Sequence, residues 1–260
     1  MDSDKYFEYL IKEAVKNAQS FSGWDFSHLT STGRIEGAPL KWNYYNIVSR
    51  YLTGVTKLLD MGTGGGEILS KFSPLPLVTY ATEQYNPNVA VARKGLEPLG
   101  VKVIEIEEEK EPPFNSNLPF EDDFFDLIIN RHEAYYPPEL MRILRPEGMF
   151  ITQQVGGRTN QNLVNILNGE PSKYSKWNLE SAVKELESAG FTITRQQEEV
   201  QFYRYYDIGA VVYHLIAIPW TIEDFSTERY KDKLLELHKI IESDGFYDAV
   251  QHRFMLIARK

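Results

Sequence analysis

The residues with the clearest chemical potential lie in the stretch LLDMGTGGGE, residues 58–67. In it Asp60 is followed by three glycines at alternate positions, Gly62, Gly64 and Gly66. Glycines at a turn between a strand and a helix let a ligand approach backbone that any side chain would block. A dinucleotide needs the spacing G-x-G-x-x-G, and here an acid, Glu67, occupies the third position, where it would repel a pyrophosphate. The pattern D-x-G-x-G-x-G therefore favours a ligand without phosphate.

A positively charged ligand would explain the acid beside these glycines. S-adenosylmethionine (SAM) has a sulfonium, an α-ammonium and an adenosine, and we expect Asp60 to lie near the ammonium. Glu83, followed by Gln84, ends a second apolar run. Neighbouring strands of a doubly wound sheet end side by side, so a carboxylate at this point can accept both ribose hydroxyls. The plainer alternatives are an ordinary strand-to-helix turn and a surface acid at position 83.

The elements that must position these residues alternate along the chain. Five apolar runs typical of strands cover residues 56–61, 77–83, 101–107, 124–130 and 148–155. Between them, helical patterns follow the glycine turn through Phe72, cover residues 86–100, and begin again at Pro137. Strands that alternate with helices predict βαβ units and a parallel sheet.

Further elements are predicted on both sides of this region. Before it we expect an amphipathic helix over residues 4–19, a loop with aromatic anchors over 20–38 and a second helix over about 40–52. After it we expect a helix, a strand, a largely helical stretch and a final strand, over 178–190, 191–200, 207–243 and 252–260. The stretch 207–243 is too long for a simple hairpin, so we interpret it as an insertion packed over the sheet edge.

These segments resemble class I SAM-dependent methyltransferases, the Rossmann-like kind. LLDMGTGGGE is similar to the family's first motif, LPFEDDFFDLIINRHEAY to its fourth-strand segment, and ILRPEGMFITQQ to the helix, turn and fifth strand that follow. The resemblance covers about residues 40–155. It implies a doubly wound α/β fold with a seven-stranded, mostly parallel sheet whose last strand, HRFMLIARK, is antiparallel. It also implies SAM bound across the strand tips, methyl transfer, and S-adenosyl-L-homocysteine as the product.

We therefore expect a single methyltransferase domain over residues 1–260. Its predicted parts are an N-terminal cap segment, a SAM-binding core, a helical insertion acting as a lid, and the final strand, at residues 1–38, 40–200, 203–246 and 247–260. Aromatic side chains in the cap and the insertion predict an enclosure for a compact acceptor: Phe21, Trp24, Phe26, Tyr203, Tyr205, Tyr206 and Trp220. The alternative is that both pieces complete the core.

The resemblance also implies roles at the tip of the fourth strand. Asn130 would contact the methionine part of SAM, and His132 is the candidate general base because its ordinary pKa lies near neutrality. Glu133 would orient His132 or act in its place, and the alternative is a structural polar cluster.

The family often has an acid near the adenine amine, before an L-P-F-like turn. Counting back to the position of this acid from the turn PPF gives Glu108, and counting back from the turn LPF gives Phe114. The acidic residues around Glu108 also fit a solvated charge cluster.

Composition limits the other classes of function. The 260 residues include no cysteine, which excludes thiolate metal sites and cysteine nucleophiles, and the histidine spacing predicts no metal site. The net charge of −9 argues against nucleic acid as a partner, because phosphate contacts need Lys and Arg. No segment has the apolar length of a membrane span, and we expect a cytoplasmic protein.

The predicted function is SAM-dependent methylation of a small molecule; the alternatives are RNA methylation and non-catalytic SAM binding by a regulatory protein.

Overall fold

The computed structural model describes residues 3–21, 26–107, 109 and 112–260. The chain divides into two compact units. Unit 1 comprises residues 1–40, 156–177 and 199–252, and unit 2 comprises residues 41–155, 178–198 and 253–260. Neither unit is one continuous segment, so no single boundary separates them along the chain.

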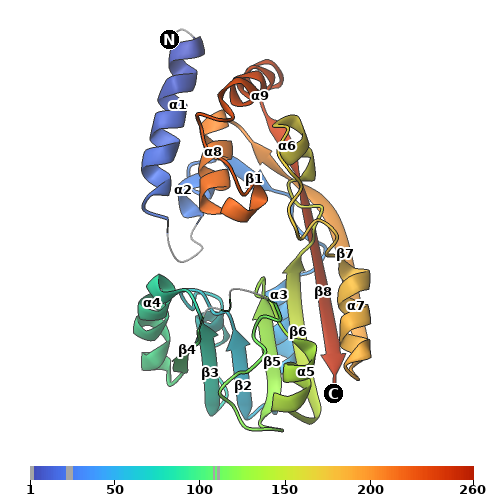
Figure 1. The fold of residues 1–260 in the computed structure, drawn as a ribbon. Coiled ribbons are helices and arrows are strands. Elements are labelled where there is room, and N and C mark those ends of the chain that lie inside the picture. The colour runs from blue at the N-terminus through green and yellow to red at the C-terminus, as the bar shows by residue number, and fades with distance from the viewer. Residues whose placement is uncertain (1–2, 22–25, 108, 110–111) are drawn as a thin grey trace. The chain divides into compact units, whose positions relative to one another are not determined.

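Unit 2 contains the alternating strands that the sequence predicts (Figure 1). They are β2 (Lys57–Met61), β3 (Val78–Glu83), β4 (Lys102–Glu105), β5 (Phe125–Arg131) and β6 (Leu144–Val155). β2 pairs in parallel with β3 and with β5, β3 pairs with β4, and β5 pairs with β6. Strands covered on both faces are rich in apolar residues at their centres, and the side chains of Leu58, Leu59, Ile128 and Ile129 are fully buried.

The helices of unit 2 lie before, between and after these strands in the chain. They are α3 (Tyr44–Tyr51), α4 (Asn86–Leu96), α5 (Pro137–Ile143) and α7 (Leu179–Ser188), with 3₁₀ turns η1 (Leu69–Phe72) and η2 (Glu97–Leu99). Side chains that satisfy free backbone N–H groups fix where two of them begin. Asn43 accepts from the N–H of Asn46 at 2.9 Å at the start of α3. Asn178 and Ser181 form a capping box at the start of α7.

Antiparallel strands complete the sheet. β8 (Tyr247–Arg259) pairs antiparallel with β6, from Met149 opposite Arg259 to Val155 opposite Arg253. β7 (Thr192–Tyr205) lies next to β8, and β1 (Ile35–Gly37) pairs antiparallel with the end of β7. The order is β1-β7-β8-β6-β5-β2-β3-β4. The predicted fold class and the antiparallel last strand are confirmed, and the sheet of the described residues has one strand more than predicted.

Unit 1 is built from helices around its own apolar core. Its elements are α1 (Ser3–Ala18), α2 (Ser27–Thr30), α6 (Gln161–Ile166), α8 (Ile208–Ala217), η3 (Pro219–Thr221) and α9 (Lys231–Asp244), together with β1, the end of β7 and the start of β8. α1 packs against α8, and Figure 1 shows these two helices side by side. α8 is apolar and buried around nearly its whole circumference. The helical insertion between the last two long strands is therefore confirmed in α8, η3 and α9.

Two predicted segments differ in the structure. The stretch 20–38, predicted as a loop, contains α2 and β1, and β1 depends on distant pairing with Tyr203–Tyr205 that no local pattern reveals. The helix predicted after the glycine turn is only the 3₁₀ turn η1, because four glycines disfavour helix before it and Pro74 ends it.

The aromatic side chains predicted to enclose an acceptor have partners inside unit 1. Phe21 packs on Phe26, Phe26 lies against the ring of His214, and the hydroxyl of Tyr205 hydrogen-bonds with His214 at 2.8 Å. Trp24 lies outside the described residues. The lid remains a prediction. In the part of the chain that the structure describes, no helix has the length and apolar character needed to cross a membrane.

Candidate functional site

The predicted cofactor-binding residues that are described all belong to unit 2. Asp60 lies near the end of β2, is 6% exposed, and accepts a hydrogen bond from the Thr63 hydroxyl at 2.7 Å. The chain then turns through backbone angles that favour glycine, since φ is +63° at Gly62, +63° at Gly64 and +88° at Gly66. The alternating glycines therefore serve the turn itself as well as any ligand.

The glycines also differ in what a side chain would meet. A Cβ on Gly62 would lie 2.5 Å from the side chain of Glu133, so this carboxylate rests directly against the turn. A Cβ on Gly66 would lie 2.6 Å from the side chain of Leu96 in α4. Gly62 thus keeps the turn open toward the other functional side chains, whereas Gly66 permits close packing of a helix.

Glu83 binds the glycine turn from the neighbouring strand. It ends β3 and is 4% exposed. One carboxylate oxygen accepts from the N–H of Gly64 at 2.7 Å, and the other accepts from the N–H of Tyr85 at 2.8 Å. The predicted side-by-side placement of the two strand ends is therefore present, and Glu83 holds the turn in place.

Glu133 adds a third carboxylate at this turn. One of its oxygens accepts from the N–H of Ala134 at 3.1 Å, from the Gln84 amide at 3.2 Å and from the Asn115 amide at 3.4 Å. The Asn115 amide also donates to the carbonyl of Ala134 at 2.9 Å, which ties this strand tip to a loop after β4. Glu133 therefore belongs with the glycine turn, and among its described hydrogen bonds none goes to His132.

The pKa values of all three carboxyl groups, Asp60, Glu83 and Glu133, are raised. Burial and, to a smaller extent, the charge of Glu83 raise the pKa of Asp60 to about 7 against the opposing hydrogen bond from Thr63 and the charge of Arg131. Desolvation and the charge of Glu83 raise the pKa of Glu133 to about 7. Burial also raises the pKa of Glu83, although the N–H groups of Tyr85 and Gly64 favour its charged form. Like charges held close and away from water are relieved by a proton or by a bound cation.

Asn130 lies at the tip of β5 with its side chain fully buried. Its Oδ1 accepts from the Gln154 amide at 2.7 Å and from the Thr152 hydroxyl at 3.0 Å, both on β6. Its backbone carbonyl accepts from the hydroxyl of Tyr44 at 3.1 Å. Its Nδ2 has no hydrogen-bond partner among the described residues. A buried amide donor without a partner is costly, so this group is available to a ligand.

His132 follows β5 in the left-handed region, with φ at +69°, which is uncommon for any residue but glycine. Its backbone N–H donates to the carbonyl of Gln153 at 2.8 Å, and its Nε2 lies 3.1 Å from the Gln153 side-chain nitrogen. Desolvation by surrounding protein, with the charges of Arg131 and Arg253, lowers the pKa of His132 well below its ordinary value. The residue still reaches solvent, so a substrate could contact the ring.

Sequence reasoning placed most of these residues at one edge of the sheet, and the structure adds the partners of their side chains. The side chain within hydrogen-bond distance of the His132 ring is that of Gln153, whereas the described hydrogen bonds of the Glu133 carboxylate go to Gln84, Asn115 and Ala134. Sequence reasoning missed Asn115 and Trp42, which lie in no motif, and it gave no role to Gln153 within ILRPEGMFITQQ; only the tertiary structure brings the three side chains to the tip of β5. Glu108 lies outside the described residues, so the adenine contact stays a prediction.

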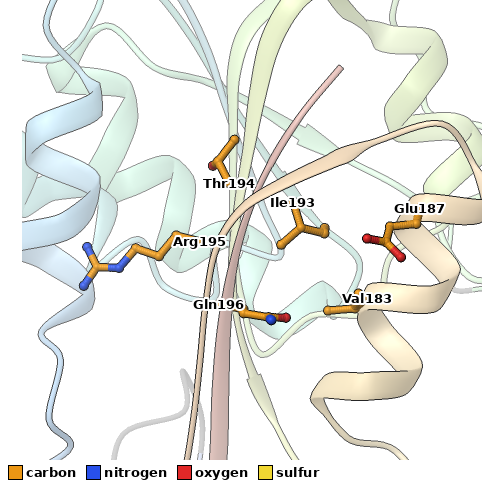
Figure 2. Close-up of a pocket in the computed structure, with 6 residues that line it drawn as sticks. All are labelled: Val183, Glu187, Ile193, Thr194, Arg195 and Gln196. Carbon is orange, nitrogen blue, oxygen red and sulfur yellow. The ribbon is translucent and has the colours of Figure 1, made fainter.

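A separate hollow of about 300 Å³ lies between α7 and the start of β7. Figure 2 shows its lining, in which Arg195 extends to the side of β7 away from Glu187: Val183, Glu187, Ile193, Thr194, Arg195 and Gln196. None of these residues belongs to the glycine turn or to the tips of β2, β3 and β5. Within the described ranges, no group of three or more His, Asp or Glu residues is arranged to hold a metal ion.

Residues 59–152 match a family model described as a methyltransferase domain. The match includes Asp60, the three glycines, Glu83, Asn130 and His132. The chain therefore contains a class I SAM-dependent methyltransferase domain, whose cosubstrate is SAM. No curated protein shows significant similarity to the chain.

Solved structures with low sequence identity share the fold. A candidate methyltransferase from Bacillus halodurans C-125 is 19% identical with a TM-score of 0.58, covering 83% of this chain and 98% of its own. The YcgJ protein from Bacillus subtilis is 17% identical with a TM-score of 0.57, covering 84% and 97%. The [4+2]-cyclase SpnF is 16% identical with a TM-score of 0.51, covering 83% and 79%. These likenesses establish the fold alone, and the cyclase shows that the fold is not confined to methyl transfer.

The described residues fit SAM. The cluster of Asp60, Glu83 and Glu133 suits a ligand with a positive charge, since the charge of Glu83 acts on both of the other carboxyl groups and these two have pKa values raised to about 7. The unpartnered amide of Asn130 offers a donor to a carboxylate or carbonyl oxygen. When bound, SAM supplies a methyl carbon activated by its sulfonium.

Proposed function

We propose that the protein transfers a methyl group from SAM to a small-molecule acceptor. Asp60, Glu83 and Glu133 would hold the cationic and ribose parts of SAM, and Asn130 its methionine part, along the glycine turn. His132, on the solvent-reaching side of the same strand tip, would contact the acceptor. Methyl transfer needs mainly the alignment of the attacking atom with the methyl carbon, so rigid positioning on strand ends suits it.

The observation that carries the proposal is the crowding of three carboxyl groups around one glycine turn. Glu83 binds the N–H of Gly64, Glu133 rests against Gly62, and Asp60 is buried two residues before that glycine. The positive charge of Arg131 lowers the pKa of Asp60 only partly, because burial and the charge of Glu83 keep that pKa raised. A sulfonium and an ammonium supply the missing positive charge, whereas a pyrophosphate would add to the repulsion.

The structure after the turn also argues against a dinucleotide. A pyrophosphate site uses the N-terminus of a full helix, whose free N–H groups and dipole favour anions. Here the turn leads into the four-residue 3₁₀ turn η1. The backbone therefore lacks the anion site that NAD binding would require at this position.

The small-molecule acceptor is supported by charge. The net charge is −9, and neutralising the phosphates of an RNA needs clustered Lys and Arg. The alternatives are an RNA acceptor and a SAM-binding protein that transfers nothing.

Calorimetric titration with SAM and with NAD tests the cofactor site. We expect SAM to bind more tightly than NAD, and Asp60→Asn or Glu83→Gln to weaken SAM binding by about tenfold or more, which is about 1.4 kcal/mol. The control is Glu121→Gln, which neutralises an exposed acid in unit 2. Unchanged SAM affinity in the folded Asp60 and Glu83 variants, or tighter binding of NAD, would overturn the assignment.

Transfer from methyl-labelled SAM to fractions of a cell extract tests the acceptor. We expect label in the small-molecule fraction and none in RNA. Label in RNA would replace the proposed acceptor with the RNA alternative. Tight SAM binding without transfer to any fraction would favour the non-catalytic alternative.

A further inference from the structure

Three side chains form a hydrogen-bonded row that ends on His132. The indole N–H of Trp42 donates to Oε1 of Gln153 at 2.9 Å, and Nε2 of Gln153 lies 3.1 Å from Nε2 of His132. Trp42 is 7% exposed and Gln153 is 4% exposed. Arg131 on β5 pairs with Gln153 on β6, so the sheet register places Gln153 beside the residue that precedes His132. The row therefore starts in the core and reaches the solvent at the imidazole.

The chemistry of this row determines the position of the imidazole proton. An indole N–H only donates, so it selects the oxygen end of the Gln153 amide. The nitrogen end of that amide, which also only donates, must then face the imidazole. Nε2 of His132 accepts this hydrogen bond with its lone pair, and in the neutral ring the proton is on Nδ1.

Two further features hold the ring in this state. The carbonyl of Gln153 accepts from the backbone N–H of His132 at 2.8 Å, so Gln153 binds both the backbone and the side chain of the histidine. The positive charges of Arg131 and Arg253 oppose protonation, and together with desolvation they keep the pKa of His132 low. Among the described residues, none hydrogen-bonds with Nδ1, so this edge of the exposed residue can meet a ligand.

We propose that Trp42 and Gln153 are positioning residues that hold His132 as a neutral imidazole protonated at Nδ1, so that His132 donates a hydrogen bond to the methyl acceptor and does not remove its proton. That the ligand of His132 is the methyl acceptor rests on the proposed function, whereas the position of the proton on the imidazole does not. This arrangement selects an acceptor with a hydrogen-bond-accepting oxygen or nitrogen near the atom to be methylated. It replaces the general-base role that the sequence suggests for His132.

Nitrogen-15 NMR of the full chain with labelled histidine tests the proton position without any substrate. The His132 signals are assigned as those missing from the His132→Asn variant, which can keep the left-handed backbone because asparagine adopts it readily. We expect a protonated Nδ1 and an unprotonated Nε2 at neutral pH. A proton on Nε2, or a charged ring at neutral pH, would overturn the proposal.

Variants of the two positioning residues sharpen the test. In Gln153→Glu a carboxylate oxygen faces the ring, so we expect the proton to move to Nε2 or the ring pKa to rise. In Trp42→Phe the amide is free to rotate, so a mixture of the two neutral forms is expected. Gln196→Glu, which adds the same charge at an exposed site on β7, is the control and leaves the signals unchanged. Wild-type signals in Gln153→Glu would show that Gln153 does not position the ring.

Activity gives a second readout once an acceptor is available. An asparagine amide can donate a hydrogen bond but cannot serve as a base, so His132→Asn should retain at least about tenfold more kcat than His132→Ala. Equal loss in both variants, with SAM affinity unchanged, would restore the general-base role. Failure of SAM binding would defeat the proposed function and leave the NMR result standing, so the two failures are distinguishable.

Discussion

At the scale of single residues, Asp60 and Glu133 should couple SAM binding to pH. Both carboxyl groups have a pKa of about 7 without a ligand, and a bound cation favours their ionised forms. SAM affinity should therefore rise as pH increases from about 5.5 to about 7.5, by up to about tenfold per pH unit for each proton released on binding. This range stays below the usual pKa of an α-ammonium, so SAM keeps its charge throughout.

Calorimetry in buffers of different ionisation enthalpy measures the protons released on binding. Asp60→Asn should release fewer protons than the wild type, because one titrating carboxyl has been removed. A wild-type affinity that is constant over this pH range, with no proton release, would contradict the role of these acids.

The same aspartate should limit the stability of the ligand-free protein. Its pKa is raised from 3.8 to about 7 in the folded state, so the folded state binds the proton more tightly than the unfolded state. The resulting stability is complete below about pH 4 and is lost as pH rises through about 7. Asp60→Asn keeps the hydrogen-bond acceptor for Thr63 without the charge, and should raise the free energy of unfolding at about pH 8 by an amount on the order of 1–3 kcal/mol.

Urea unfolding at several pH values checks this prediction. The difference between variant and wild type should shrink as pH falls through about 7 to below about 4, where the wild-type carboxyl becomes protonated in both states. A variant less stable than the wild type at about pH 8 would show that the buried charge is already compensated.

At the scale of elements, the contact between the glycine turn and α4 should depend on the missing side chain of Gly66. A Cβ there would lie 2.6 Å from Leu96, and φ is +88°. Gly66→Ala should therefore lower the free energy of unfolding by about 1–3 kcal/mol. Leu96→Ala removes the atoms that the new methyl would meet, so the double variant should lose about 1 kcal/mol less than the sum of the single variants.

A double-mutant cycle by urea unfolding measures this coupling. Strictly additive losses would show that the backbone angle alone, and not packing against α4, requires glycine at this position. Gly62 differs because its neighbour is Glu133, so its substitution should affect SAM affinity in addition to stability.

At the scale of the whole molecule, the proposed SAM contacts all lie in unit 2, while unit 1 has a separate apolar core. Leu215 in α8 is 1% exposed within that core. Leu215→Ala should lower stability by about 2–4 kcal/mol, the usual cost of such a cavity. SAM affinity, measured by calorimetry at a temperature where the variant is folded, should stay within about twofold of the wild type, a change well below 1 kcal/mol. A larger loss would mean that unit 1 contributes to SAM binding.

The sequence by itself determined the alternating strands and the positions of the glycines and acids at their ends. Strands covered on both faces are continuous apolar runs, and parallel strands end at one edge, so local patterns were sufficient to bring Asp60 and Glu83 together. The segment from Gly62 to Phe72 was harder to predict, because glycine and proline opposed the helix expected there from the fold.

The tertiary structure alone decided which side chains meet at the tip of β5. Glu133 binds beside the glycine turn and His132 binds Gln153, although the two residues are adjacent in the chain. This separation follows from the left-handed backbone at His132 and from the register that pairs Arg131 with Gln153. Both depend on contacts between residues far apart in the sequence, and no local pattern of residue types specifies them. The three-residue strand β1 has the same cause, since its only strand pairing among the described residues is with Tyr203–Tyr205.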